Sequence, residues 1–114
     1  MTGPPRTALI TGGSGCLGIN LTRYLLGNGF SVRSLDIAPF PYDDLRGRIE
    51  VIIGDVRDRK AVAAAVAGAE IVVHGAAALP LQKERDIWTT QVDGTGVVLG
   101  ECLASGVRRF VQIS

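Results

Sequence analysis

The feature that most constrains the fold of this chain is a glycine-rich turn, TGGSGCLG, at residues 11–18. An apolar run at residues 8–10 leads into the turn, and a helical pattern that begins near Cys16 leads out of it. In a strand–turn–helix unit, Gly12 allows the tight turn, Gly15 lets a pyrophosphate approach the backbone, and Gly18 lets the helix lie close to the sheet. Free N–H groups and the helix dipole at such a helix start attract phosphate oxygens. The turn therefore predicts a dinucleotide site, with a tight turn that binds no ligand as the alternative. The expected phosphate-binding residues are Gly12, Gly15, Cys16, Leu17 and Gly18.

Strand and helix patterns alternate along the chain. Apolar runs of strand length occupy residues 7–11, 31–36, 50–54, 70–74 and 109–114. Helical patterns occupy residues 16–28, the segment from the Asp58 cap to Gly68, and residues 87–105. This alternation predicts an α/β fold with a doubly wound parallel sheet in the order 3-2-1-4-5, because right-handed crossovers join such strands. The ligand crevice is expected at the carboxyl ends of the strands, where Gly12, Asp36, Asp55 and Ala76 all fall.

The apolar spacing also predicts which face of each helix is buried. In the first helix the expected buried face holds Leu17, Leu21, Tyr24 and Leu25. In the second helix it holds Val62, Ala65, Val66 and Ala69. In the third helix it holds Trp88, Val92, Thr95, Leu99, Cys102 and Leu103. Trp88 is accordingly expected in the core or in the wall of a pocket.

Asp36 ends the second predicted strand, close to 20 residues after the glycine-rich turn, where an acid supports the dinucleotide interpretation. A carboxylate there can accept hydrogen bonds from both ribose hydroxyls of an adenosine, and it would repel a 2′-phosphate. Residues 14–17 and 37–39 contain no arginine, and Arg33 lies inside the strand. NAD is therefore favoured over NADP. The alternative for Asp36 is a solvated acid at the end of a strand.

Asp55 and His74 follow or end two further strands. The Asp55 carboxylate or a backbone amide beside it could meet the edge of an adenine, or Asp55 could be a turn acid before the Asp58 cap. His74 is the only histidine, and no acid, Ser or Cys stands at a spacing that indicates catalysis. A packed or hydrogen-bonded His74 is therefore favoured over a catalytic base.

Composition narrows the class of protein. The 114 residues carry a net charge of +1, which suits one globular domain and gives no sign of a nucleic-acid surface. Residues 1–6 lack a signal-peptide pattern, and no apolar run is long enough to span a bilayer. Cys16 and Cys102 form neither a metal-ligand spacing nor a disulfide framework. A cytoplasmic location without a bound metal is therefore expected.

Together these motifs resemble the N-terminal part of the extended short-chain dehydrogenases/reductases, the NAD-dependent epimerase/dehydratase group. The resemblance runs from about Thr7 to Ser114 and rests on six segments. They are the glycine-rich turn, Leu35-Asp36, GDVRD at 54–58, HGAA at 74–77, VDGT at 92–95 and RFVQIS at 109–114. Sterol and 3β-hydroxysteroid dehydrogenases look similar in this stretch, which does not separate them from sugar-nucleotide epimerases.

The resemblance implies a Rossmann fold and a role for each matched position. Asp36 would bind the adenosine ribose, Asp55 and Val56 would flank the adenine, and Ala76 and Ala77 would line the path toward the nicotinamide. Gln91 stands where the family usually has Asn, one methylene shorter. The resemblance also implies an oxidoreductase or isomerase, with a homodimer as one assembly to test.

The family's catalytic Tyr-x-x-x-Lys pair is missing from the 114 residues, since Asn28 and Arg46 stand four positions after Tyr24 and Tyr42. Residues 1–114 are therefore expected to form the NAD(P)-binding domain of a longer enzyme, without its substrate domain. That enzyme would move a hydride between NAD and a carbinol carbon of a sugar nucleotide or a sterol-like alcohol. The alternatives are a stand-alone dinucleotide-binding module and a truncated, non-catalytic product.

Overall fold

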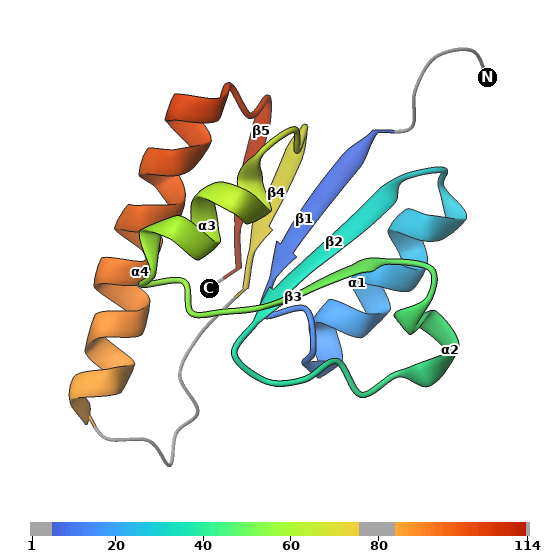
Figure 1. The fold of residues 1–114 in the computed structure, drawn as a ribbon, viewed down its shortest axis with the longest axis horizontal. Helices are drawn as coiled ribbons and strands as arrows, with labels where there is room; N and C mark the ends of the chain where they lie inside the picture. The colour runs from blue at the N-terminus through green and yellow to red at the C-terminus, as the bar shows by residue number, and fades with distance from the viewer. Residues whose placement is uncertain (1–5, 76–83, 114) are drawn as a thin grey trace.

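A five-stranded parallel sheet forms the centre of the molecule. The computed structural model describes residues 6–75 and 84–113 (Figure 1). The strands are β1 (Thr7–Thr11), β2 (Ser31–Asp36), β3 (Glu50–Ile53), β4 (Ile71–His74) and β5 (Arg109–Gln112). All neighbouring strands pair in parallel, and their order, β3-β2-β1-β4-β5, confirms the predicted topology.

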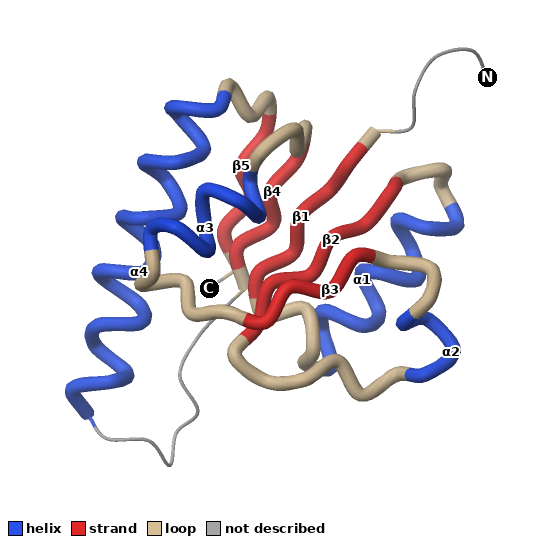
Figure 2. The backbone as a smooth tube through the Cα atoms, in the orientation of Figure 1, coloured by secondary structure: helices blue, strands red, loops and turns tan. Residues whose placement is uncertain are grey.

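Helices cover both faces of this sheet. Figure 2 shows α1 (Cys16–Gly27) and α2 (Asp43–Arg46) on one face, with α3 (Arg59–Val66) and α4 (Glu84–Ser105) on the other. The chain changes face once, after β3, because the strands are added in one direction from β1 to β3 and then in the opposite direction from β4 to β5. The apolar pattern predicts no helix at α2, a single turn that buries Leu45.

Two buried clusters hold the layers together. Leu9 and Val72 of the sheet pack with Val62 and Val66 of α3 and with Val98 of α4. On the opposite face, a second cluster joins the sheet to α1 and consists of Ala8, Ile10, Leu25 and Val32. Each fully buried aliphatic side chain of this size stabilises the fold by about 1.5–3 kcal/mol.

The predictions for α3 are confirmed. Asp58 is the N-cap, and its side chain accepts a hydrogen bond from the Lys60 N–H at 3.1 Å. Three of the four side chains predicted to share its buried face are buried within the helix, namely Val62, Ala65 and Val66, whereas Ala69 is buried but lies beyond the end of the helix at Val66.

The predicted buried face of α1 is wrong for two of its four residues. Leu17 and Tyr24 are 55% and 67% exposed, whereas the buried positions are Gly18, Ile19, Thr22 and Leu25. The helix is rotated from the predicted orientation because Gly18 packs directly on the backbone of the glycine-rich turn. A Cβ at Gly18 would lie 2.7 Å from the Gly13 Cα.

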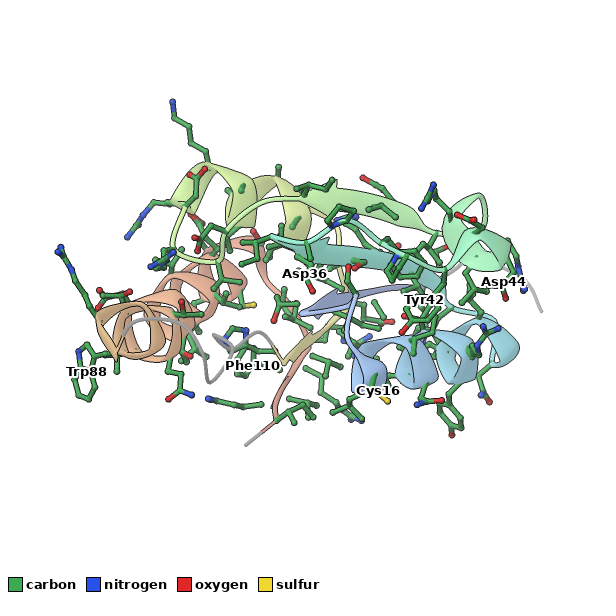
Figure 3. All side chains as sticks on the ribbon, turned by 90° about the horizontal axis from the view of Figure 1, so that it is seen from below. Cys16, Asp36, Tyr42, Asp44, Trp88 and Phe110 are labelled. Atoms are coloured by element: carbon green, nitrogen blue, oxygen red, sulfur yellow. The ribbon has the colours of Figure 1, made fainter. Side chains whose placement is uncertain are left out.

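The predicted buried face of α4 is also wrong at most positions. Trp88 and Leu103 are 66% and 84% exposed, while the buried residues of this helix are Gly94, Val98 and Cys102. Figure 3 shows Trp88 on the outer side of α4, directed away from the sheet. Trp88 is therefore not a core residue.

Candidate functional site

The glycine-rich turn joins β1 to α1 at the carboxyl edge of the sheet. Gly12 has a φ of +74°, and its N–H donates to the Leu35 carbonyl of β2 at 2.8 Å. Gly15 is the N-cap of α1, and no side chain caps this helix. The first intrahelical bond runs from the Ile19 N–H to the Gly15 carbonyl at 2.9 Å. The N–H groups of residues 16–18 precede that bond, so they stand at a helix start where anions bind favourably.

The glycines of this turn are required for different reasons. A Cβ at Gly18 would lie 2.7 Å from the Gly13 carbonyl oxygen, and a Cβ at Gly13 would overlap the Ser34 side chain. Packing therefore demands glycine at both positions. A Cβ at Gly15 would meet nothing closer than the Gly12 carbonyl oxygen at 3.6 Å, and the φ of Gly15 is an ordinary −85°. The fold itself has no need of glycine at residue 15, which fits a position kept open for an external group such as a pyrophosphate.

Asp36 lies directly beside this turn (Figure 3). Its Oδ2 accepts a hydrogen bond from the Ser14 N–H at 3.1 Å, and its Oδ1 accepts one from the Ala38 N–H at 3.0 Å. The Ser14 hydroxyl donates to the Ala38 carbonyl at 3.3 Å. An ionised carboxylate offers about four acceptor positions, so Asp36 retains capacity for two hydroxyl donors. The carboxylate can therefore still accept hydrogen bonds from a ribose.

The end of β3 carries the next predicted residues. The Arg57 guanidinium binds the Asp55 carboxylate, with a shortest distance of 2.6 Å between Nη2 and Oδ2. This hydrogen bond holds the pKa of Asp55 below its usual value. Val56 is buried, and a Cβ at Gly94 of α4 would lie 2.6 Å from its Cγ2. Only the backbone of Val56 can therefore meet a ligand, whereas the Asp55 side chain is partly exposed.

His74 is fixed inside the fold at the end of β4. The ring is 2% exposed, with Nδ1 at 2.7 Å from the Thr11 Oγ1 and Nε2 at 3.0 Å from the Thr95 Oγ1. Burial lowers the pKa of His74, which favours the neutral ring. These contacts fit the predicted packed and hydrogen-bonded histidine. The predicted residues Ala76 and Ala77 lie outside the described residues.

A hollow opens between the ends of β1 and β4, where the sheet changes direction. The empty space there, including the part open to solvent, is about 250 Å³. It is lined by Ile10, Thr11, Gly12, Leu17, Gly18, Leu21, Val73, Gly75 and Ile113. This is the predicted position of the crevice, and it brings the turn, α1 and the end of β4 to one place.

Three polar residues of the site had no predicted role. Ser14 bonds Asp36, Arg57 bonds Asp55, and Thr95 bonds His74. All three lie inside motifs named above, so their positions could have marked them. The VDGT motif does not, however, indicate that Thr95 meets a histidine 21 residues away.

The described residues contain no cluster of three or more His, Cys, Asp or Glu that could hold a metal ion. In the same residues, no helix combines the length and the hydropathy that crossing a bilayer requires.

A doubly wound parallel sheet with a glycine-rich turn after its first strand defines a Rossmann-type domain. Residues 9–114 match the model of the 3-beta hydroxysteroid dehydrogenase/isomerase family, and the chain belongs to that family. This result confirms the resemblance to extended short-chain dehydrogenases/reductases.

Individual relatives agree with this assignment. The chain is 38% identical over 110 residues to the uncharacterized protein y4nG of Sinorhizobium fredii, covering 96% of this chain and 27% of y4nG. It is 34% identical to a 3-beta-hydroxysteroid dehydrogenase of Mycolicibacterium neoaurum, covering 90% and 30%. A crystal structure of the Bordetella bronchiseptica enzyme WbmG, in complex with NAD and UDP, superposes with a TM-score of 0.82 at 28% identity, covering 96% and 37%. The chain thus spans between 27% and 37% of the length of these proteins.

Proposed function

We propose that residues 1–114 form an NAD-binding domain, with the dinucleotide at the carboxyl edge of β1, β2 and β3. The observation that carries the proposal is the hydrogen bond from the Ser14 N–H to the Asp36 carboxylate. It joins an acceptor for ribose hydroxyls to a helix start that has no side-chain cap. The N–H groups of residues 16–18 would bind the pyrophosphate, and Asp36 would bind the adenosine ribose.

The proposed preference for NAD over NADP follows from the hydrogen bonds that Arg33 already makes. Arg33 is the arginine nearest to Asp36 along β2. Its Nη1 donates to the Ala65 and Ala67 carbonyls at 2.5 and 2.7 Å, and its Nε bonds Glu50 at 3.3 Å. Arg33 is therefore held at the C-terminal end of α3 and cannot also neutralise a 2′-phosphate beside Asp36. A 2′-phosphate would therefore meet the Asp36 carboxylate without the Arg33 guanidinium to compensate its charge.

For the longer protein, we propose NAD-dependent oxidation of the secondary alcohol of a sterol-like substrate. The family match and the Mycolicibacterium relative support this substrate class. NAD would supply the hydride acceptor. A sugar nucleotide is the second candidate, because the WbmG structure holds both NAD and UDP. The homodimer is a further proposal, which sedimentation velocity tests.

Isothermal titration calorimetry with NAD tests the binding proposal. Asp36→Ala should weaken NAD binding by about 1–3 kcal/mol, because it removes hydrogen bonds to a charged group. The control is Asp93→Ala, which removes an exposed carboxylate from α4 and should leave NAD binding unchanged. An unchanged affinity for Asp36→Ala would exclude the ribose role, and a wild-type chain that does not bind NAD would exclude the proposed function.

A further inference from the structure

His74 connects three other elements of the fold at the end of β4. The ring is 2% exposed. Its Nδ1 lies 2.7 Å from the Thr11 Oγ1 of β1, and its Nε2 lies 3.0 Å from the Thr95 Oγ1 of α4. The Phe110 ring of β5 stands beside it, with 6.1 Å between the two ring centroids. Both ring nitrogens of His74 therefore have a hydroxyl partner inside the fold.

The Thr11 hydroxyl is shared between His74 and the residue that follows it. The Gly75 N–H donates to the Thr11 Oγ1 at 3.0 Å and to the Thr11 carbonyl at 3.1 Å. The Ile113 N–H donates to the His74 carbonyl at 3.0 Å. Thr11, Gly75 and Ile113 all line the hollow between β1 and β4, and Thr11 and Gly75 form its rim. His74 is thus joined, by hydrogen bonds or by the chain itself, to three residues of the hollow.

The rim is continuous with the glycine-rich turn. Thr11 directly precedes Gly12, whose φ of +74° begins the turn. A displacement of Thr11 would therefore also move the turn, where the pyrophosphate is proposed to bind.

The two hydroxyls suit a neutral imidazole better than a protonated one. A hydroxyl both donates and accepts, so Thr11 and Thr95 can satisfy either tautomer of the neutral ring. Protonation makes both ring nitrogens donors. The Thr11 Oγ1 would then have to accept from Nδ1 while it also accepts from the Gly75 N–H, so the ring and the rim would compete for one oxygen.

Within the described part of the chain, no charged group is paired with the ring. The strands β1 and β4 contain no titratable side chain besides His74. The titratable side chains described on α4 and β5 are Arg85, Asp93, Glu101, Cys102 and Arg109. None of these forms a hydrogen bond or an ion pair with the ring, and burial is the cause that lowers the pKa of His74. A protonated ring would be a buried charge without a carboxylate partner, which is costly.

Resting on the proposed function, we propose that His74 is a positioning residue, held by Thr95, whose neutral ring keeps the rim in the geometry that binds a dinucleotide. Protonation of the ring breaks the shared contact at the Thr11 hydroxyl and loosens the end of β4 from the end of β1. The affinity for NAD therefore declines as the pH falls through the range in which the ring takes up a proton. By reciprocity, bound NAD disfavours the protonated ring.

The test uses the wild-type chain, in which His74 is the only histidine and its ring proton gives a single NMR titration curve. The pKa of His74 is measured with and without saturating NAD, and the affinity for NAD is measured by calorimetry at pH 7 and 5. Circular dichroism verifies the fold at each pH. The affinity should fall by about threefold or more, and NAD should lower the pKa of His74 by about 0.5 or more, because a tenfold change in affinity corresponds to one pH unit.

Variants test the two positioning residues. His74→Gln should make the affinity for NAD independent of pH between 7 and 5, because an amide stays neutral. Thr95→Val should weaken NAD binding at pH 7 by about threefold or more, because it leaves a buried ring nitrogen without its partner, and Thr95→Ser should restore the affinity. The control is Thr90→Val, the same change at another partly buried position of α4, which should leave NAD binding unchanged.

The outcomes separate this inference from the proposed function. An affinity that does not change with pH, or a pKa of His74 that NAD leaves in place, would overturn the inference while NAD binding stands. An affinity that rises as the pH falls, as simple attraction between an imidazolium and a diphosphate would give, would also overturn it. Wild-type affinity in Thr95→Val would overturn the role of Thr95. A wild type that does not bind NAD at pH 7 would overturn the proposed function and, with it, this inference.

Discussion

Gly15→Ala should weaken NAD binding while leaving the free energy of unfolding nearly unchanged. The φ and ψ of Gly15 are −85° and 177°, a conformation that alanine adopts readily, and the new methyl would meet only the Gly12 carbonyl oxygen at 3.6 Å. Two small effects on stability oppose each other. Reduced freedom of the unfolded chain stabilises by about 0.4–1 kcal/mol, whereas alanine is a poorer N-cap than glycine by a similar amount. The free energy of unfolding should therefore change by less than about 1 kcal/mol.

The methyl group that Gly15→Ala adds should weaken the binding of a dinucleotide. It occupies the approach to the N–H groups of residues 16–18, where the pyrophosphate is proposed to bind. Losing one hydrogen bond to a charged oxygen costs about 1.5–3 kcal/mol, which corresponds to a roughly 10- to 150-fold weaker affinity for NAD. Calorimetric titration gives the affinity, and urea unfolding followed by circular dichroism gives the stability.

Gly18→Ala is the matched comparison, because it adds the same methyl three residues along. Its Cβ would lie 2.7 Å from backbone atoms of Gly13 that cannot move aside, so the fold should lose about 1–3 kcal/mol. Gly100→Ala, which has no neighbour within 4 Å, should instead stabilise α4 by about 1 kcal/mol. The reasoning fails if Gly15→Ala binds NAD like the wild type, or if it destabilises the fold as much as Gly18→Ala does.

Two further predictions concern stability. Because burial lowers the pKa of His74 below 6.5, the unfolded chain binds a proton first, and the free energy of unfolding should decline as the pH falls below about 6.5. His74→Gln should flatten that slope in urea unfolding between pH 7 and 5, and an unaltered slope would contradict it. Arg33→Met should lower the free energy of unfolding by about 1–3 kcal/mol, because the Ala65 and Ala67 carbonyls lose a charged donor. Chemical denaturation beside the exposed Arg59→Met control measures this, and a loss equal to the control's would refute it.

The strands and their order could be predicted because apolar runs of strand length are followed by residues that turn the chain or carry a charge. Gly12 turns the chain after β1, and Asp36 ends β2. Because right-handed crossovers join parallel strands, few strand orders are compatible with the predicted elements. The Asp58 cap and the buried face of α3 followed from the same local rules.

The buried faces of α1 and α4 could not be predicted from apolar spacing. Small residues set the orientation of both helices, because Gly18 of α1 packs on the glycine-rich turn and Gly94 of α4 packs on Val56, which follows β3. Glycine carries no apolar signal, so the larger Leu17 and Trp88 were wrongly assigned to the interior. Contacts such as Arg57 with Thr89 depend on tertiary packing between segments that are distant in sequence.

The bonds from the Ser14 and Ala38 amides to Asp36 have a consequence for the energetics of association. A surface aspartate ordinarily samples several rotamers, and a ligand that captures it must restrict that motion. Here the polypeptide imposes the restriction during its own folding, before any nucleotide arrives. The side-chain entropy is thus lost when the domain folds and not when the ligand binds. Each new hydrogen bond to the ligand therefore contributes more of its free energy to the affinity.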